Sequence, residues 1–309
     1  MDQHTRRRHT NSCRVVVVVA VRQPLSREPI TVNTWELTAL VWCGSLFAGF
    51  IGALTGLGGG IIITPLLTLA LGIDIRYAIG AALVSVIATS SGAAAAYVKE
   101  GFSNIRIGML LEIATTVGAV VGASLALRMR TGTIAVIFGI VLLYSAYVST
   151  RTEGQKSVSG QPDRISAFFR LDSSYPSSAG PKPYRVRNVP AGSGLMFIAG
   201  ILSGLLGIGS GAVKVIAMDQ AMHIPFKVST TTSNFMIGVT AAASAGVYLK
   251  RGYIDPGLAM PVVLGVLPGS LLGARVLPLA KTRVLRFLFG VVVAVLSLEM
   301  IYHGLTGRI

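Results

Sequence analysis

Charged residues are scarce in this 309-residue chain, where Asp, Glu, Lys and Arg together make up 13% of the sequence. Soluble domains contain about 25% of them. Many of these charges fall in residues 1–30 and 151–190, so the remaining segments are almost entirely apolar. With 52% hydrophobic residues, the composition excludes an ordinary soluble enzyme and predicts an integral membrane protein embedded in the lipid bilayer.

Residues that usually carry catalysis or hold metal ions are also few. The two cysteines, Cys13 and Cys43, form neither a disulfide framework nor a CxxC knuckle. The four histidines lie in the tails or at the ends of apolar stretches, and there is no HExxH and no GxSxG motif. We therefore predict no catalytic residue and no metal site. The net charge of +15 does not indicate nucleic-acid binding, because the basic residues separate apolar stretches instead of gathering on one face with aromatics.

Eight apolar stretches predict an all-α membrane protein of about eight transmembrane helices, because transmembrane strands would need alternation and closure into a barrel. The stretches are residues 37–71, 78–98, 107–127, 133–149, 194–222, 229–249, 258–278 and 285–302. The predicted organisation is a basic, disordered N-terminal tail (1–34), a first transmembrane repeat (35–150), a linker (151–190), a second transmembrane repeat (191–303) and a short C-terminal tail (304–309).

The two halves of the chain align without gaps at an offset of 151 residues. Gly56–Gly60 then matches Gly207–Gly211, and Tyr97–Gly101 matches Tyr248–Gly252. Duplicated halves are typical of secondary transporters, which place their site between the halves near the bilayer midplane. Rows of small residues in the third helix of each half, such as Gly118 and Gly122, predict close helix packing.

The first helix of each half is expected to break at its glycine cluster. Residues 37–71 would form a straight helix of about 50 Å in a hydrocarbon core of about 30 Å, and each glycine costs about 1 kcal/mol relative to Ala. A helix that restarts after a break presents free N–H groups to an anion. Lys214 follows the second cluster and could reinforce the site or pair with Asp219. The predicted substrate-binding residues are Gly56, Gly58, Gly59, Gly60, Gly207, Gly209, Ser210, Gly211, Lys214, Ser233 and Asn234.

Two topologies are compatible with these breaks. If each half crosses four times, 18 basic residues lie on one side and 7 on the other, whereas three crossings give 12 and 13. The positive-inside rule favours four crossings, with both termini and the linker 151–190 in the cytoplasm and the two repeats parallel.

The segments Ala48–Gly60, Val228–Thr240 and Tyr248–Asp255 resemble the TauE/SafE family of sulfite and organosulfonate exporters. The resemblance implies a bacterial inner-membrane anion permease of about eight helices, without a cofactor, driven by protons or by the membrane potential. It also points to both glycine clusters and to Ser233 and Asn234 as functional positions. Ser210 departs from the family pattern, which usually has Gly there.

The sequence thus predicts a secondary permease for a small anion, sulfite or an organosulfonate, as its partner. A non-transporting scaffold and an anion channel remain the alternatives, and the sequence leaves open whether the chain forms a homo-oligomer.

Overall fold

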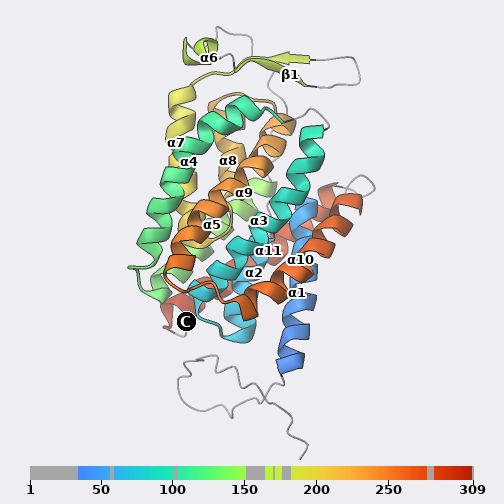
Figure 1. Cartoon of the computed structure of the whole chain (residues 1–309), viewed down its shortest axis with the longest axis vertical. Helices are drawn as coiled ribbons and strands as arrows, with labels where there is room; N and C mark the ends of the chain where they lie inside the picture. Colours follow the sequence, from blue (N-terminus) through green and yellow to red (C-terminus); the bar gives the residue numbers. More distant parts are fainter. Residues whose placement is uncertain are drawn as a thin grey trace, which may run out of the picture.

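A computed structural model describes residues 34–55, 59–99, 103–150, 164–169, 171–175, 182–276 and 282–307 of the chain. The described part is built from helices, with one small antiparallel hairpin (Figure 1). In the first half the elements are α1 (Thr34–Thr55), α2 (Gly60–Pro65), the π-helix η1 (Leu66–Ala70), α3 (Ile75–Lys99), α4 (Ile105–Ala126) and α5 (Thr131–Thr150). The linker contains α6 (Arg164–Phe168), β1 (Ser173–Tyr175) and β2 (Lys182–Tyr184). The second half contains α7 (Val189–Leu206), α8 (Gly211–Ile216), the π-helix η2 (Ala217–Ala221), α9 (Phe226–Lys250), α10 (Pro256–Val276) and α11 (Thr282–Leu305).

Among the described helices, three are long and apolar enough to cross a bilayer by themselves: Ile105–Ala126, Val189–Leu206 and Pro256–Gly273. Shorter apolar helical segments accompany them in both halves. Large apolar side chains such as Ile113, Leu264 and Leu298 are more than half exposed on the outside of the bundle. Such a surface suits contact with lipid rather than water.

Glycine rows bring helices from different halves into close contact. Gly118 of α4 and Gly200 of α7 face the backbone of the opposite helix: a Cβ placed on Gly200 would lie 2.1 Å from the carbonyl oxygen of Thr115. Gly265 and Gly269 of α10 contact the backbone of α1 in the same way. The prediction that these small-residue rows serve packing is therefore confirmed. Helix α4 lies against α7, α1 against α10, α3 against α9, and α5 against α11.

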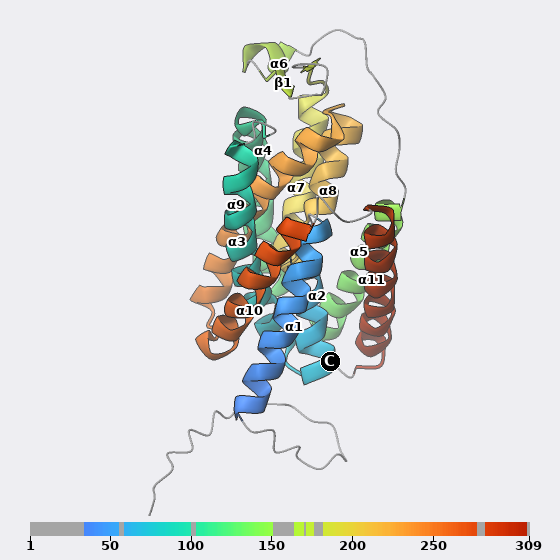
Figure 2. The same ribbon diagram turned by 90° about the vertical axis from the view of Figure 1, so that its right-hand side faces the viewer.

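Each glycine cluster ends one helix, and the next helix folds back beside it. Gly59 lies against Ala48 and Gly49 of α1, and Leu66, seven residues later, lies near Gly44. The chain from α2 to η1 therefore runs antiparallel to α1 (Figure 2). In the second half, the Met222 carbonyl after η2 accepts a hydrogen bond from the Arg187 N–H just before α7 (3.2 Å). In both halves the chain after the break thus returns towards the end at which the broken helix begins.

This geometry contradicts the predicted four crossings per half. The helical stretch from Gly60 to Ala70 has 11 residues, about 16 Å at ~1.5 Å per residue, which is about half of a hydrocarbon core. It returns towards the end where α1 began, so α1 and the segment from α2 to η1 start and finish at the same end of the described bundle, and α3, α4 and α5 follow. The alternative of three crossings per half fits the described helices.

The linker and the C-terminal end of α11 lie at opposite ends of the described bundle. At one end, the Asn104 side chain before α4 donates hydrogen bonds to the Leu171 carbonyl (3.1 Å) and to the Tyr184 hydroxyl (2.8 Å) of the linker. Burial raises the pKa of Tyr184 above its ordinary value. At the other end, Gly304 near the C-terminus contacts Gly132 at the start of α5. The described residues therefore disagree with the prediction that the linker and the C-terminus share one side, a prediction that rested on four crossings per half; the N-terminal tail lies outside the described residues.

Candidate functional site

The two helix breaks meet in the interior of the bundle. A Cβ placed on Gly60, at the start of α2, would lie 3.0 Å from the carbonyl oxygen of Gly207. Val86 of α3 contacts both breaks, since its side chain faces Gly60 and Gly209. The chain thus brings two of its most glycine-rich segments, far apart in sequence, into direct contact. Gly56 and Gly58 lie outside the described residues.

The second break has an unusual backbone. Gly207, Gly209 and Ser210 all adopt left-handed conformations, with φ of 69°, 68° and 45°. The left-handed region is accessible to glycine, whereas it costs a residue with a Cβ about 1–2 kcal/mol. Ser210 is therefore the strained member of the cluster. Such strain persists only where the surrounding structure holds it, and it gathers at functional sites.

Ser210 also carries an unsatisfied hydroxyl at the N-terminus of α8. The residue is 3% exposed, and its Oγ finds no hydrogen-bond partner among the residues that the structure describes. Ser210 is the N-cap of α8, but its side chain makes no capping hydrogen bond. The N-cap of α2 is Gly59, which has no side chain with which to cap the helix. The first N–H groups of a helix need partners from outside the helix. A buried donor without a partner is costly, so this hydroxyl indicates a place for a ligand or water.

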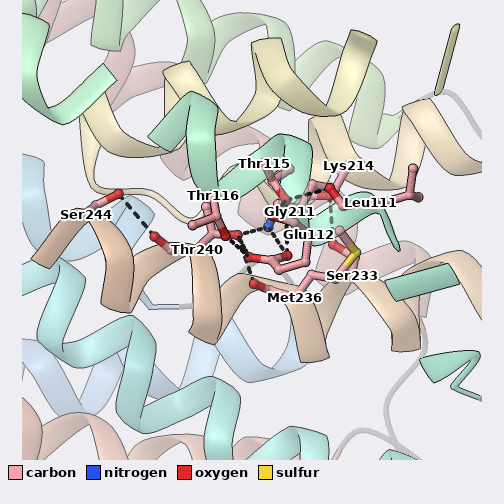
Figure 3. Close-up of polar contacts among 10 residues, drawn as sticks. All are labelled: Leu111, Glu112, Thr115, Thr116, Gly211, Lys214, Ser233, Met236, Thr240 and Ser244. Carbon is pink, nitrogen blue, oxygen red and sulfur yellow. Dashed lines mark hydrogen bonds and ion pairs between the residues drawn. The ribbon is translucent and has the colours of Figure 1, made fainter. Parts of the chain in front are cut away.

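Lys214, one turn into α8, is completely buried and forms an ion pair across the bundle. Its Nζ lies 3.8 Å from Glu112 Oε2 on α4 and donates a hydrogen bond to Thr240 Oγ1 on α9 at 2.5 Å (Figure 3). Thr240 in turn donates to Glu112 Oε1 at 2.6 Å. Because a helical side chain leans towards the N-terminus of its helix, Lys214 covers the turn that starts at Ser210. A buried charge needs such a partner, since an unpaired one is strongly destabilising.

Two further hydroxyls of α4 surround the carboxylate of Glu112. Thr115 Oγ1 lies 3.1 Å from Oε2, and Thr116 Oγ1 lies 3.2 Å from Oε1. Glu112 is only 7% exposed, so these hydroxyls and Lys214 replace the water that it lacks. The three elements α4, α8 and α9 therefore share one polar cluster, formed by Glu112, Thr115, Thr116, Lys214 and Thr240.

Among its described residues, the first break has no charged counterpart of Lys214. After Gly60 come the buried Ile61, Ile62 and Ile63, and the hydroxyl of the buried Thr64 donates to the Gly60 carbonyl at 3.3 Å. Gly59 is buried against α1, with an ordinary right-handed backbone. Ile63 stands 151 residues before Lys214, so the counterpart of the buried ammonium is a fully buried aliphatic side chain.

The structure places the predicted α9 residues close to the second break. Ser233 donates a hydrogen bond to the carbonyl oxygen of Gly211 at 3.3 Å, and Asn234 beside it is 7% exposed. Glu112 and Thr240 were not among the predicted substrate-binding residues. The sequence does contain a signal for the pairing of Glu112 with Lys214, since the two have opposite charges in apolar stretches, where such charges usually pair.

Comparisons with known proteins agree on one family. The family described as "Sulfite exporter TauE/SafE" matches residues 41–300. Two similar curated proteins come from Bacillus subtilis (strain 168): the probable membrane transporter protein YunE, 26% identical over 84% of this chain and 96% of its own length, and YjnA, 28% identical over 83% and 96%. A probable membrane transporter protein of Methanocaldococcus jannaschii, MJ0441, is 22% identical over 82% of this chain and 91% of its own length. No solved structure matches the chain.

Proposed function

Because this chain belongs to the TauE/SafE family of membrane transporters, we propose that it is a secondary permease that moves sulfite or an organosulfonate across a bacterial inner membrane. The anion binds where the two helix breaks meet, on the side of α8. The observation that carries this proposal is the buried, unpartnered hydroxyl of Ser210 above a completely buried Lys214.

The arrangement of the two halves supports a transporter architecture. The starts of α2, α3, α4 and α5 at Gly60, Ile75, Ile105 and Thr131 are each 151 residues before the starts of α8, α9, α10 and α11 at Gly211, Phe226, Pro256 and Thr282. The contacts of α1 with α10 and of α7 with α4 exchange when the halves are exchanged. We therefore propose two repeats of inverted topology, each made of a broken helix that folds back at its glycine cluster and three further helices, an organisation shared by many secondary transporters.

The chemistry of the second break suits a sulfur oxyanion. The first N–H groups of α8, the Ser210 hydroxyl and the Lys214 ammonium offer hydrogen-bond donors and positive charge from one direction. Gly207 and Gly209 lack side chains, so an anion can approach the backbone closely. We propose the same anion-facing role for Gly59 and Gly60 across the contact, and for Ser233 and Asn234 on α9. Lys214 is fully enclosed in this conformation, so passage of an anion requires the site to open alternately to the two sides.

Flux of radiolabelled sulfite into proteoliposomes of the purified protein tests the proposal. We expect saturable uptake that unlabelled sulfite and an alkanesulfonate such as isethionate both inhibit. Empty liposomes, and liposomes with an unrelated membrane protein, provide the baseline. Inert vesicles would contradict the proposal and favour a scaffold, whereas non-saturating electrical conductance would favour a channel.

A further inference from the structure

We propose that Glu112 is the proton-binding residue that couples anion movement to protons, because the incoming anion and the Glu112 carboxylate compete for the same buried ammonium of Lys214. The proposal rests on the permease function above and deepens it. Nothing in the composition or the family match assigns a role to Glu112; its position opposite Lys214 does.

Charge neutrality of the enclosed cluster is the first argument. Without substrate, Lys214 and Glu112 form one cation and one anion, 3.8 Å apart at their nearest charged atoms. A monoanion that binds Lys214 would leave one uncompensated negative charge in a site where neither side chain is more than 10% exposed. A buried charge without a partner is strongly unfavourable. Uptake of one proton by the Glu112 carboxylate restores neutrality, and loss of that proton accompanies release of the anion.

The hydroxyl groups around Glu112 can serve both protonation states. Thr240 Oγ1 donates to Glu112 Oε1 at 2.6 Å, and the Met236 carbonyl lies 2.9 Å from the same hydroxyl. Thr115 likewise lies 3.1 Å from Glu112 Oε2 and 3.0 Å from the Leu111 carbonyl. When the carboxyl is protonated, its O–H donates to Thr240 Oγ1, and the Thr240 hydroxyl turns to Met236. No described donor of the cluster loses its partner in either state.

Few other charges face Glu112. Helix α7, which lies against α4, has no ionisable residue between Val189 and Leu206. On α9 the charged residues Lys227 and Lys250 are at the two ends, and the titratable Tyr248 donates to the Gly204 carbonyl. On α4 itself Arg106 is exposed in the first turn, and Asp219 follows Lys214 by five residues on η2. Lys214 is therefore the charged side chain that the described structure places against Glu112.

The sign of the expected pH dependence follows directly. Protonation of Glu112 frees Lys214 for the anion, so anion binding is tightest at low pH and weakens as pH rises. For one linked proton the apparent Kd changes by up to about tenfold per pH unit.

Proteoliposome transport of radiolabelled sulfite by E112Q tests the proposal. E112Q leaves Lys214 as an unpaired buried cation in the empty site, so we expect it to hold sulfite more tightly, to exchange it more slowly than the wild type, and to lose the protein's contribution to the pH dependence of binding. It should also fail to accumulate sulfite in response to an imposed pH gradient. The matched control is Glu299→Gln, which removes an exposed carboxyl of α11 and should retain both activities. Sulfite itself binds a proton, which contributes to the pH dependence of its transport. The same measurement with E112Q gives this contribution, so that it can be subtracted.

The outcomes separate the two proposals. Gradient-driven accumulation by E112Q, or sulfite binding by E112Q with the same pH dependence as the wild type, would overturn the coupling role of Glu112 while the permease function stands. Absence of exchange in the wild type would overturn the permease function itself. If E112Q does not fold, a pH-indicator dye with the wild-type protein in weak buffer decides: isethionate, which stays ionised, should cause uptake of about one proton per bound anion. No proton uptake would contradict the proposal.

Discussion

The two helix breaks share a backbone plan but differ in chemistry. Both end a long helix at a glycine cluster, fold back as a short helix with a π-helical end, and meet at Gly60 and Gly207. The first break continues into three buried isoleucines. The second contains a strained serine and a buried lysine that is paired with Glu112.

This difference teaches that a duplicated scaffold does not need two copies of its binding chemistry. Val263 stands 151 residues after Glu112, and Ile63 stands 151 residues before Lys214, so both partners of the ion pair are apolar in the other half. Of the three threonines in the cluster, Thr240 has a threonine counterpart in the other half, Thr89. Thr89 bonds to carbonyls of its own helix. The first break thus supplies apolar contacts, whereas the polar cluster combines Glu112 of the first half with Lys214 and Thr240 of the second.

The largest expected effect concerns the opposite orientation of the two halves. In a protein with Cys13 and Cys43 replaced by serine, single cysteines at the exposed positions Ser174 and Thr306 should lie on opposite sides of the membrane. A membrane-impermeant maleimide added to intact cells should therefore label one of them and not the other. Labelling of both, or of neither until the cells are opened, would restore the parallel arrangement of the halves.

Replacement of Lys214 by methionine should abolish sulfite flux, by more than about 100-fold, because the anion loses its charged partner. It should also destabilise the protein by about 3–5 kcal/mol, since Glu112 is left as an unpaired buried charge. Flux and thermal melting in detergent measure the two effects. The double variant K214M/E112Q should regain most of the stability without the flux, and Lys250→Met, at an exposed position, is the control. Normal flux in K214M would exclude Lys214 from the site.

Replacement of Gly209 by leucine should close the second break. A Cβ there would lie 2.7 Å from Ile237 Cγ2, and φ is 68°, so we expect a cost of about 2–4 kcal/mol and loss of flux. Two controls separate the causes. A Cβ on Gly246 meets no atom within 4 Å, so Gly246→Leu adds bulk at an open position of α9, and Gly252→Ala has strain at φ 74° but open space. Both should transport, and a G209L protein that transports like them would remove the second break from the site.

The smallest effect is expected from Ser210→Gly, which makes the second cluster resemble the first. Loss of the left-handed strain should stabilise the protein by about 1 kcal/mol. Loss of the hydroxyl should weaken sulfite binding about tenfold, as expected for one hydrogen bond to a charged group. The melting temperature should therefore rise, which reports greater stability, and the KM of uptake should also rise, which reports weaker binding. An unchanged KM would show that the hydroxyl does not touch the anion.

Much of this architecture could be predicted from the sequence, because it depends on local composition. The glycine clusters, the length of residues 37–71 and the rows at Gly118 and Gly265 each report a local property, either a break or a close approach. The direction of α2 after its break could not be predicted in the same way. It depends on the packing of Leu66 near Gly44, a tertiary contact, and the bias in basic residues pointed to the wrong alternative.

The polar cluster shows the same limit. Lys214 was recognisable because an ammonium in an apolar stretch needs a reason. Its partner could not be identified by spacing, since Glu112 lies on a different helix, and Thr240 is one of many threonines that could bond to their own backbone.

The most direct test of the central claim is an anomalous-scattering map of crystals soaked in selenite, a heavier analogue of sulfite. We expect one selenium peak at the contact between the two breaks, within hydrogen-bonding reach of Ser210 Oγ and Lys214 Nζ. A peak elsewhere in the protein, with this contact closed and occupied by side chains alone, would contradict the account.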